Sequence, residues 1–256
     1  MRPYGRRLRH AAVTGGRLWR PALCFALALG LGACSSSQKL SHRDKGDRAY
    51  AKRDWPQAIQ EYQLYVEEGS AQGDAMLAQY MLARAYFENQ DYPTAAVEFE
   101  IFQRDYPRSD SLEAAAYYEA LSWVKQSPRY DRDSSITEKA LRMLDGFIQD
   151  HPQSAYLPWA VEQRRILDDK LARKDLEIAR FYQRIRRPEA AVLYYEKLLR
   201  EQPDSASWAE GFLGLLDLRL DAGQREEAAR LVEELASRQP DSELTRRARE
   251  KLARNP

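Results

Sequence analysis

The sequence predicts an all-α helical solenoid of about five helix pairs, closed by a short capping helix. Three observations support this class. A proline followed two positions later by serine recurs four times, and an alanine stands twelve positions before each of these prolines. A larger apolar residue follows each alanine by four positions, which puts the two side chains on one face of a helix. Sustained alternation of β-branched residues, the pattern of strands, is weak.

The repeated alanines mark the second helix of each pair. They are Ala58, Ala95, Ala140, Ala191 and Ala228, and their larger partners are Tyr62, Phe99, Leu144, Tyr195 and Val232. The Pro-x-Ser joints lie at 107–109, 152–154, 203–205 and 240–242. Proline cannot continue a helix and serine is a good N-cap, so each joint predicts the end of one helix and the start of the next.

The alanine spacing shows where the repeats are enlarged. The intervals are 37, 45, 51 and 37 residues. One insertion is predicted to be a loop over 126–135, and the other a long first helix over 156–185. A capping helix is predicted over 243–253. The pattern resembles the tetratricopeptide (TPR) repeat, which has a period of about 34 residues and an Ala-x3-Phe second helix followed by proline.

Composition excludes several classes of protein. Of 256 residues, 40 are Lys or Arg and 39 are Asp or Glu, so the net charge of +1 favours no nucleic-acid partner. Two cysteines cannot build a disulfide framework. A hydrophobic fraction of 44% with 31% charged residues suits a helical-repeat protein better than a disordered chain or one crossing a membrane many times.

The first 33 residues have the features of a secretory signal. They carry six arginines and no acid, and 21–33 is a run of thirteen uncharged residues. Such a run is too short to span a membrane, which takes about twenty residues. A basic start, a short apolar core and small residues at its end are typical of a signal peptide. The competing interpretation, a buried helix of the mature fold, fits poorly with the flanking arginines and the glycines.

The end of this run, Leu31-Gly32-Ala33-Cys34, resembles the lipobox of bacterial lipoproteins. The resemblance implies cleavage between Ala33 and Cys34 and a covalent lipid on the Cys34 sulfur. An ordinary buried cysteine is the alternative. The polar residues of 34–41 are then a short tether, and 42–256 is the solenoid.

No motif of catalysis or metal binding is visible. None of the histidines, His10, His42 and His151, lies near a cysteine or another histidine in sequence. Carboxylates are plentiful, but on helical repeats they mostly cover solvated faces. The sequence therefore predicts no catalytic residue, no metal site and no cofactor beyond the lipid. The basic clusters at 184–187 and 246–249 are interpreted as helix-end charges rather than a nucleic-acid or lipid site.

The first helices of TPR units line a groove. Mapped through the alanine–proline frame, the groove positions fall on Arg43, Asp47, Tyr50, Leu77, Tyr80, Arg84 and Tyr118. Tyrosine together with arginine suits an extended peptide with aromatic side chains and a terminal carboxylate. Packing between helices is the competing role for each of these side chains.

Three further segments resemble the BamD family, the lipoproteins of the β-barrel assembly machinery. Asp131-Arg132-Asp133 is similar to that family's DRD-type loop, and Pro152–Tyr156 to its Pro-x-Ser-x-Tyr joint. The third segment, Leu171–Tyr182, is similar to its long fourth-unit helix. Two positions depart from the family pattern: Arg186-Arg187-Pro188 replaces an expected glycine, and Tyr194 an expected arginine that contacts BamA.

The resemblance implies a non-enzymatic role at the outer membrane, facing the periplasm. It implies docking on a BamA-like barrel protein, alongside other lipoproteins of the complex, and binding of C-terminal, aromatic-rich signals of unfolded barrel proteins. The repeats in 42–135 would face the substrate and those in 136–256 the docking partner. Asp131, Arg132 and Asp133 would either contact a partner or hold their own loop in place.

Two other functions remain open on the sequence. One is a different periplasmic TPR scaffold lipoprotein that coordinates cell-envelope or peptidoglycan assembly. The other is an enzyme such as a cell-wall hydrolase, for which no motif is seen.

Overall fold

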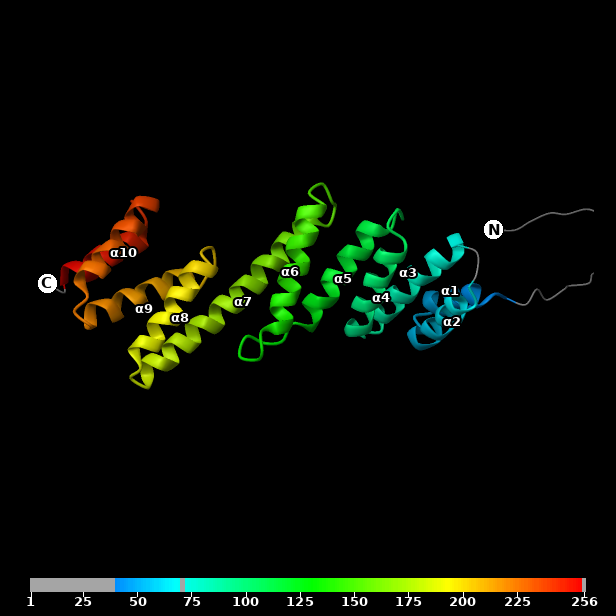
Figure 1. Ribbon diagram of the computed structural model, residues 1–256, viewed down its shortest axis with the longest axis horizontal. Coiled ribbons are helices and arrows are strands. Elements are labelled where there is room, and N and C mark those ends of the chain that lie inside the picture. Colours follow the sequence, from blue (N-terminus) through cyan, green and yellow to red (C-terminus); the bar gives the residue numbers. More distant parts are fainter. Residues whose placement is uncertain (1–39, 70–71, 255–256) are drawn as a thin grey trace, which may run out of the picture. The chain divides into compact units, whose positions relative to one another are not determined.

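The computed structural model describes residues 40–69 and 72–254, and within them the chain forms helices and no strand. The predicted all-α class is confirmed. The signal region, Ala33, Cys34 and the tether up to residue 39 lie outside the described residues. Figure 1 shows the helices in chain order: α1 (His42–Ala51), α2 (Trp55–Glu67), α3 (Gln72–Glu88), α4 (Tyr92–Asp105), α5 (Leu112–Gln126), α6 (Ser135–Asp150), α7 (Leu157–Arg184), α8 (Pro188–Glu201), α9 (Trp208–Asp221), α10 (Arg225–Arg238) and α11 (Glu243–Arg254).

The helices form five antiparallel pairs and a cap, as expected of a TPR-like solenoid. Each helix contacts the next along the chain, and first helices of neighbouring units also meet, α3 with α5 and α7 with α9. This nearest-neighbour packing is typical of repeat proteins. The apolar core therefore runs through the solenoid as a series of clusters, each shared by adjacent helices.

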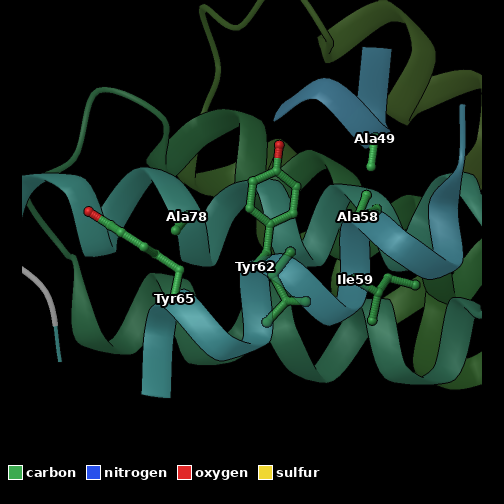
Figure 2. Packing of buried hydrophobic residues seen from close by; sticks show 8 residues of the cluster. Ala49, Ala58, Ile59, Tyr62, Tyr65 and Ala78 are labelled. Atoms are coloured by element: carbon green, nitrogen blue, oxygen red, sulfur yellow. The ribbon is translucent and has the colours of Figure 1, made fainter. Parts of the chain in front are cut away.

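The alanine frame marks the tightest packing positions. All five repeated alanines are fully buried, and their larger partners are buried as well. In the first unit, Figure 2 shows Ala58 and Tyr62 of α2 in one cluster with Ala49 of α1 and Ala78 of α3. A Cβ on Gly46 would lie 2.7 Å from the Tyr62 ring, so this glycine allows α1 to approach the tyrosine.

The turns within four pairs share one backbone conformation. Arg53, Gln90, Arg186 and Gly223 have φ values of 59°, 63°, 56° and 71°. In each turn the next residue donates its N–H to a carbonyl five positions back, at 2.8–3.0 Å, which closes the helix end. Only one of the four is the glycine that this conformation favours, and a non-glycine residue there costs roughly 1 kcal/mol. The packing of the paired helices therefore keeps the turn at the other three positions.

The serines of the Pro-x-Ser joints differ from their predicted role. Ser242 caps α11 and accepts from the Thr245 N–H at 3.1 Å. Ser109 and Ser154 instead accept from the N–H two positions on, at 3.1 and 3.0 Å, three residues before their helices begin. The Ser205 hydroxyl has no partner within the described residues. The N-cap prediction is thus wrong at three joints. At these joints the serine lies in a turn after the proline, three residues before the helix begins.

The two insertions pack against each other. The loop over 127–134 joins α5 to α6, and α7 is 28 residues long, about 42 Å. Lys170 of α7 donates to the Ser127 hydroxyl at 2.7 Å, and Lys174 donates to the Arg132 carbonyl at 3.0 Å. The long helix α7 therefore provides the side chains that hold the inserted loop in place.

A buried carboxyl on α5 gives the fold a predictable pH dependence. Glu119 is 6% exposed and accepts from Gln103 Nε2 at 2.7 Å. Burial raises the pKa of Glu119 above its usual 4.5. Because the folded state then holds the proton more tightly, this group's contribution to stability falls as the pH rises from about 4.5 through the folded pKa.

We expect the stability of Glu119→Gln, relative to wild type, to increase as the pH is raised from 4 to 7. The glutamine keeps an acceptor oxygen for Gln103 but carries no charge that must be buried. Urea unfolding at the two pH values measures the difference. Glu67→Gln, which removes an exposed carboxyl on α2, is the control for removing one negative charge. An equal effect of Glu119→Gln at both pH values would contradict the expectation.

Candidate functional site

Four predicted groove residues come together across three first helices. Tyr50 of α1, Tyr80 and Arg84 of α3, and Tyr118 of α5 form what we term the tyrosine–arginine cluster, and all four are half-buried. The Arg84 guanidinium carbon lies 4.0 Å from the centre of the Tyr118 ring. The rings of Tyr80 and Tyr118 both pack on Phe99, with centroids 6.1 and 5.7 Å away. A core residue therefore positions two tyrosines of the cluster.

The cluster offers hydrogen-bond donors around one cation. Burial raises the pKa of the Tyr50 and Tyr118 hydroxyls, so both stay protonated at neutral pH. Burial acts to lower the pKa of Arg84. The Tyr80 hydroxyl and the other polar groups around the guanidinium act more strongly in the opposite direction, so the pKa of Arg84 is raised. A cation and phenol donors on aromatic surfaces can bind an anionic group that carries an aromatic side chain.

Two of the remaining predicted groove residues, Arg43 and Asp47, interact with side chains outside the cluster. Arg43 forms an ion pair with Asp74 and lies 3.9 Å from Asp47. Asp47 accepts a hydrogen bond from the Tyr62 hydroxyl at 2.7 Å. Arg43 and Asp47 therefore stabilise the contacts of α1 with its neighbours, while Leu77 is exposed on α3.

Two features of the site escaped the sequence mapping. Glu88 accepts a hydrogen bond from Arg84 Nη2 at 3.0 Å, and its position four residues after the arginine is the signal that identifies such a pair. Tyr117 extends the aromatic surface, since it contacts Tyr118 at 4.9 Å and stacks on Tyr156 at 4.0 Å. Tyr156 lies just before α7, so sequence spacing does not indicate this contact.

The Asp131–Asp133 loop is held by local bonds. Asp131 accepts from Arg129 Nε at 2.8 Å, and this arginine lowers the pKa of Asp131 to about 2. Asp133 accepts from the Ser135 hydroxyl, and Lys174 binds the Arg132 carbonyl. All three side chains of 131–133 are exposed. The local network is thus present, and the exposed surface is also free to meet a partner.

A concave feature lies in the C-terminal repeats. A cleft of about 630 Å³ opens between α8, α9 and α10. Its apolar lining includes Leu199, Trp208, Phe212, Leu215, Leu231 and Leu235, and four arginines and three glutamates also line it. Trp208 is fixed there by a hydrogen bond from its indole N–H to the Leu199 carbonyl, at 3.2 Å. The sequence mapping did not indicate this cleft.

Over 40–69 and 72–254 no cluster of His, Cys, Asp or Glu is arranged to hold a metal ion. Within the same residues, no helix has the length and apolar character needed to cross a membrane.

Comparison with known proteins gives the family. The model of the YfiO family, described as outer membrane lipoprotein, matches residues 38–217. The chain belongs to this family. Relatives named outer membrane protein assembly factor BamD occur in Caulobacter vibrioides, 27% identical over 59% of this chain and 49% of the relative, and in Pasteurella multocida, 25% identical over 72% and 76%. A putative BamD of Aquifex aeolicus is 29% identical over 64% of this chain and 52% of the relative.

These relatives confirm the resemblance to the BamD family. The chain spans about half the length of the Caulobacter and Aquifex proteins. The matched segment of this YfiO family member includes α1 to α8, and with them the tyrosine–arginine cluster and the 131–133 loop.

Proposed function

We propose that the mature chain is a lipid-anchored, non-enzymatic component of the outer-membrane protein assembly machinery. Acyl chains on Cys34 hold it at the periplasmic face of the outer membrane. Its repeats in 42–135 bind C-terminal signals of unfolded barrel proteins. Its repeats in 136–256 dock on a BamA-like barrel protein, alongside other lipoproteins of the complex. The names of the relatives support the assembly role.

The tyrosine–arginine cluster is the observation that carries the substrate side. Its rings offer stacking surfaces for aromatic side chains, and centroid distances near 5–6 Å are typical of such pairs. Its hydroxyls and guanidinium offer donors to the polar groups of an extended chain. The cluster draws on α1, α3 and α5, so a peptide lying across it would contact three successive repeats.

Peptide binding tests the substrate side. We expect ten-residue peptides that end in phenylalanine, with further aromatics at alternate positions, to bind the purified mature protein in mild detergent. Replacing Tyr80 and Arg84 by alanine should weaken binding about tenfold or more, because stacking and a charge-assisted hydrogen bond are both lost. Fluorescence anisotropy of labelled peptides measures the affinity.

The chain provides a matched control for this double variant. Tyr130 and Arg173 form the same kind of contact, with the guanidinium carbon 4.5 Å from the ring centre. Replacing this pair by alanine should leave peptide affinity unchanged. Equal affinities of the Tyr80/Arg84 variant and wild type would exclude the groove assignment.

The docking side rests on exposed apolar surface in the C-terminal repeats. Phe181 and Ile185 at the end of α7 and Leu193 of α8 are exposed, the last at 66%. Apolar side chains of this size, together with the α8–α10 cleft, are typical of a surface that meets another protein. Gentle detergent extraction of the tagged protein, with mass spectrometry of co-purifying proteins, tests this side. A stoichiometric barrel protein with repeated periplasmic domains is the expected result, and a cell-wall partner without such a barrel would contradict it.

A further inference from the structure

We infer that Arg84 reads the free carboxylate at the end of a bound chain, and that Glu88 occupies this arginine until that carboxylate arrives. The inference rests on the proposed binding of C-terminal signals and adds a selection between chain ends and internal segments. It follows from how the guanidinium of Arg84 is used in the empty site.

The guanidinium is held in place but only partly used. The Tyr118 ring lies under it at 4.0 Å, and Glu88 engages Nη2 through a single hydrogen bond of 3.0 Å. The buried Nε of Arg84 has no hydrogen-bond partner within the described residues. A guanidinium carries five donors in a planar fork that suits two carboxylate oxygens at once. The Tyr80 hydroxyl also acts on this guanidinium. The single ion pair to Glu88 and the Nε without a partner among the described residues nevertheless leave donors for a ligand carboxylate.

Glu88 is suited to give way. Its side chain is 34% exposed, against 22% for Arg84, and its one ion pair within the described residues is to this arginine. A pair four residues apart on a helix is worth little at an exposed position, and this pair is only partly buried, with Glu88 as its more exposed partner. The carboxylate can therefore turn into water at little cost, while the more buried arginine stays on the Tyr118 ring. In the empty site Glu88 neutralises the charge of Arg84. In the occupied site the carboxylate of the bound chain replaces that of Glu88.

This exchange distinguishes the end of a chain from its middle. A terminal carboxylate replaces Glu88 with equal charge, whereas an internal segment offers only neutral carbonyl groups. Hydrogen bonds to charged groups are stronger than those between neutral ones. An aromatic side chain on the last residue would then lie against the rings of Tyr50, Tyr80 and Tyr118. The cluster thus recognises two features that occur together only at a chain end.

The test compares one phenylalanine-ended peptide as its free acid and as its C-terminal amide. We expect wild type to bind the acid about tenfold more tightly than the amide, the effect of one charge-assisted bond. Glu88→Gln should bind the acid about twofold more tightly still, because the competing carboxylate is gone. Its affinity for the amide should not change. Arg84→Lys should lose most of the preference for the acid, because an ammonium lacks the planar fork.

Glu67→Gln is the matched control, since it removes one negative charge from an exposed position at the end of α2. It should bind both peptides as wild type does. Equal binding of acid and amide by wild type would overturn the inference while leaving the peptide groove in place. Weaker binding of the acid by Glu88→Gln would overturn the role of Glu88. Failure of both peptides to bind wild type would instead reject the proposed function on which the inference rests.

Discussion

Phe99→Ala is expected to lower the free energy of unfolding by about 3–5 kcal/mol, as large-to-small changes at fully buried aromatic positions do. Phe99 is fully buried on α4, in the cluster shared by the second and third repeats. Its ring packs against Tyr80 of α3 and stacks on Tyr118 of α5, with an interplanar angle of 18° to the latter. Alanine would leave a cavity between three helices. Urea unfolding followed by circular dichroism measures the loss.

Val97 provides the control on the same helix. It is 51% exposed, so Val97→Ala should change stability by no more than about 0.5 kcal/mol. Phe99→Leu, which fills part of the cavity, should lose less than Phe99→Ala. A loss below about 1 kcal/mol for Phe99→Ala would mean that the helices close over the cavity. In that case Tyr80 and Tyr118 would shift as well, and peptide binding would fall although stability is nearly unchanged.

The repeat pattern predicts the fold well because its packing contacts are local in sequence. An alanine and a larger residue four positions later meet on one helix face, and each pair packs on its neighbour. The five alanines are therefore all fully buried, as the spacing predicts. The long helix predicted over 156–185 is α7 (Leu157–Arg184), and the capping helix is α11 (Glu243–Arg254).

The repeat pattern does not predict features that depend on tertiary packing. The left-handed turn residues Arg53, Gln90 and Arg186 lack the glycine that marks such a turn, because contacts between paired helices override local preference. In the same way, the support of the inserted loop by Lys170 and Lys174 joins positions more than forty residues apart. No periodicity indicates contacts of this kind.

The candidate site shows the same division. The groove register places Tyr80, Arg84 and Tyr118 on the first helices, and in the structure these three side chains lie close together. It assigns Arg43 and Asp47 to the same groove, yet these two pair with Asp74 and Tyr62. The repeat pattern does not indicate these two contacts, because they depend on which polar residues the neighbouring helices carry.

Cys34→Ala is expected to abolish incorporation of a fatty-acid analogue and to move the protein from the membrane to the soluble fraction. Each buried methylene contributes about 0.8 kcal/mol, and stable anchoring takes two chains or an equivalent second signal. The proposed diacylglyceryl group on the Cys34 sulfur supplies that requirement. The thirteen uncharged residues of 21–33 are too few to replace it as a membrane span.

The second cysteine is the control for this prediction. Cys24 lies within the apolar run, so Cys24→Ala should keep both labelling and membrane attachment. Thermal unfolding of the released Cys34→Ala protein should match that of the lipidated protein, because the core clusters of the described residues are built from Ala49 onward. Labelling that persists in Cys34→Ala would place the lipid elsewhere and reject the lipobox. Loss of labelling together with a lower unfolding temperature would mean instead that the anchor and the repeats stabilise each other.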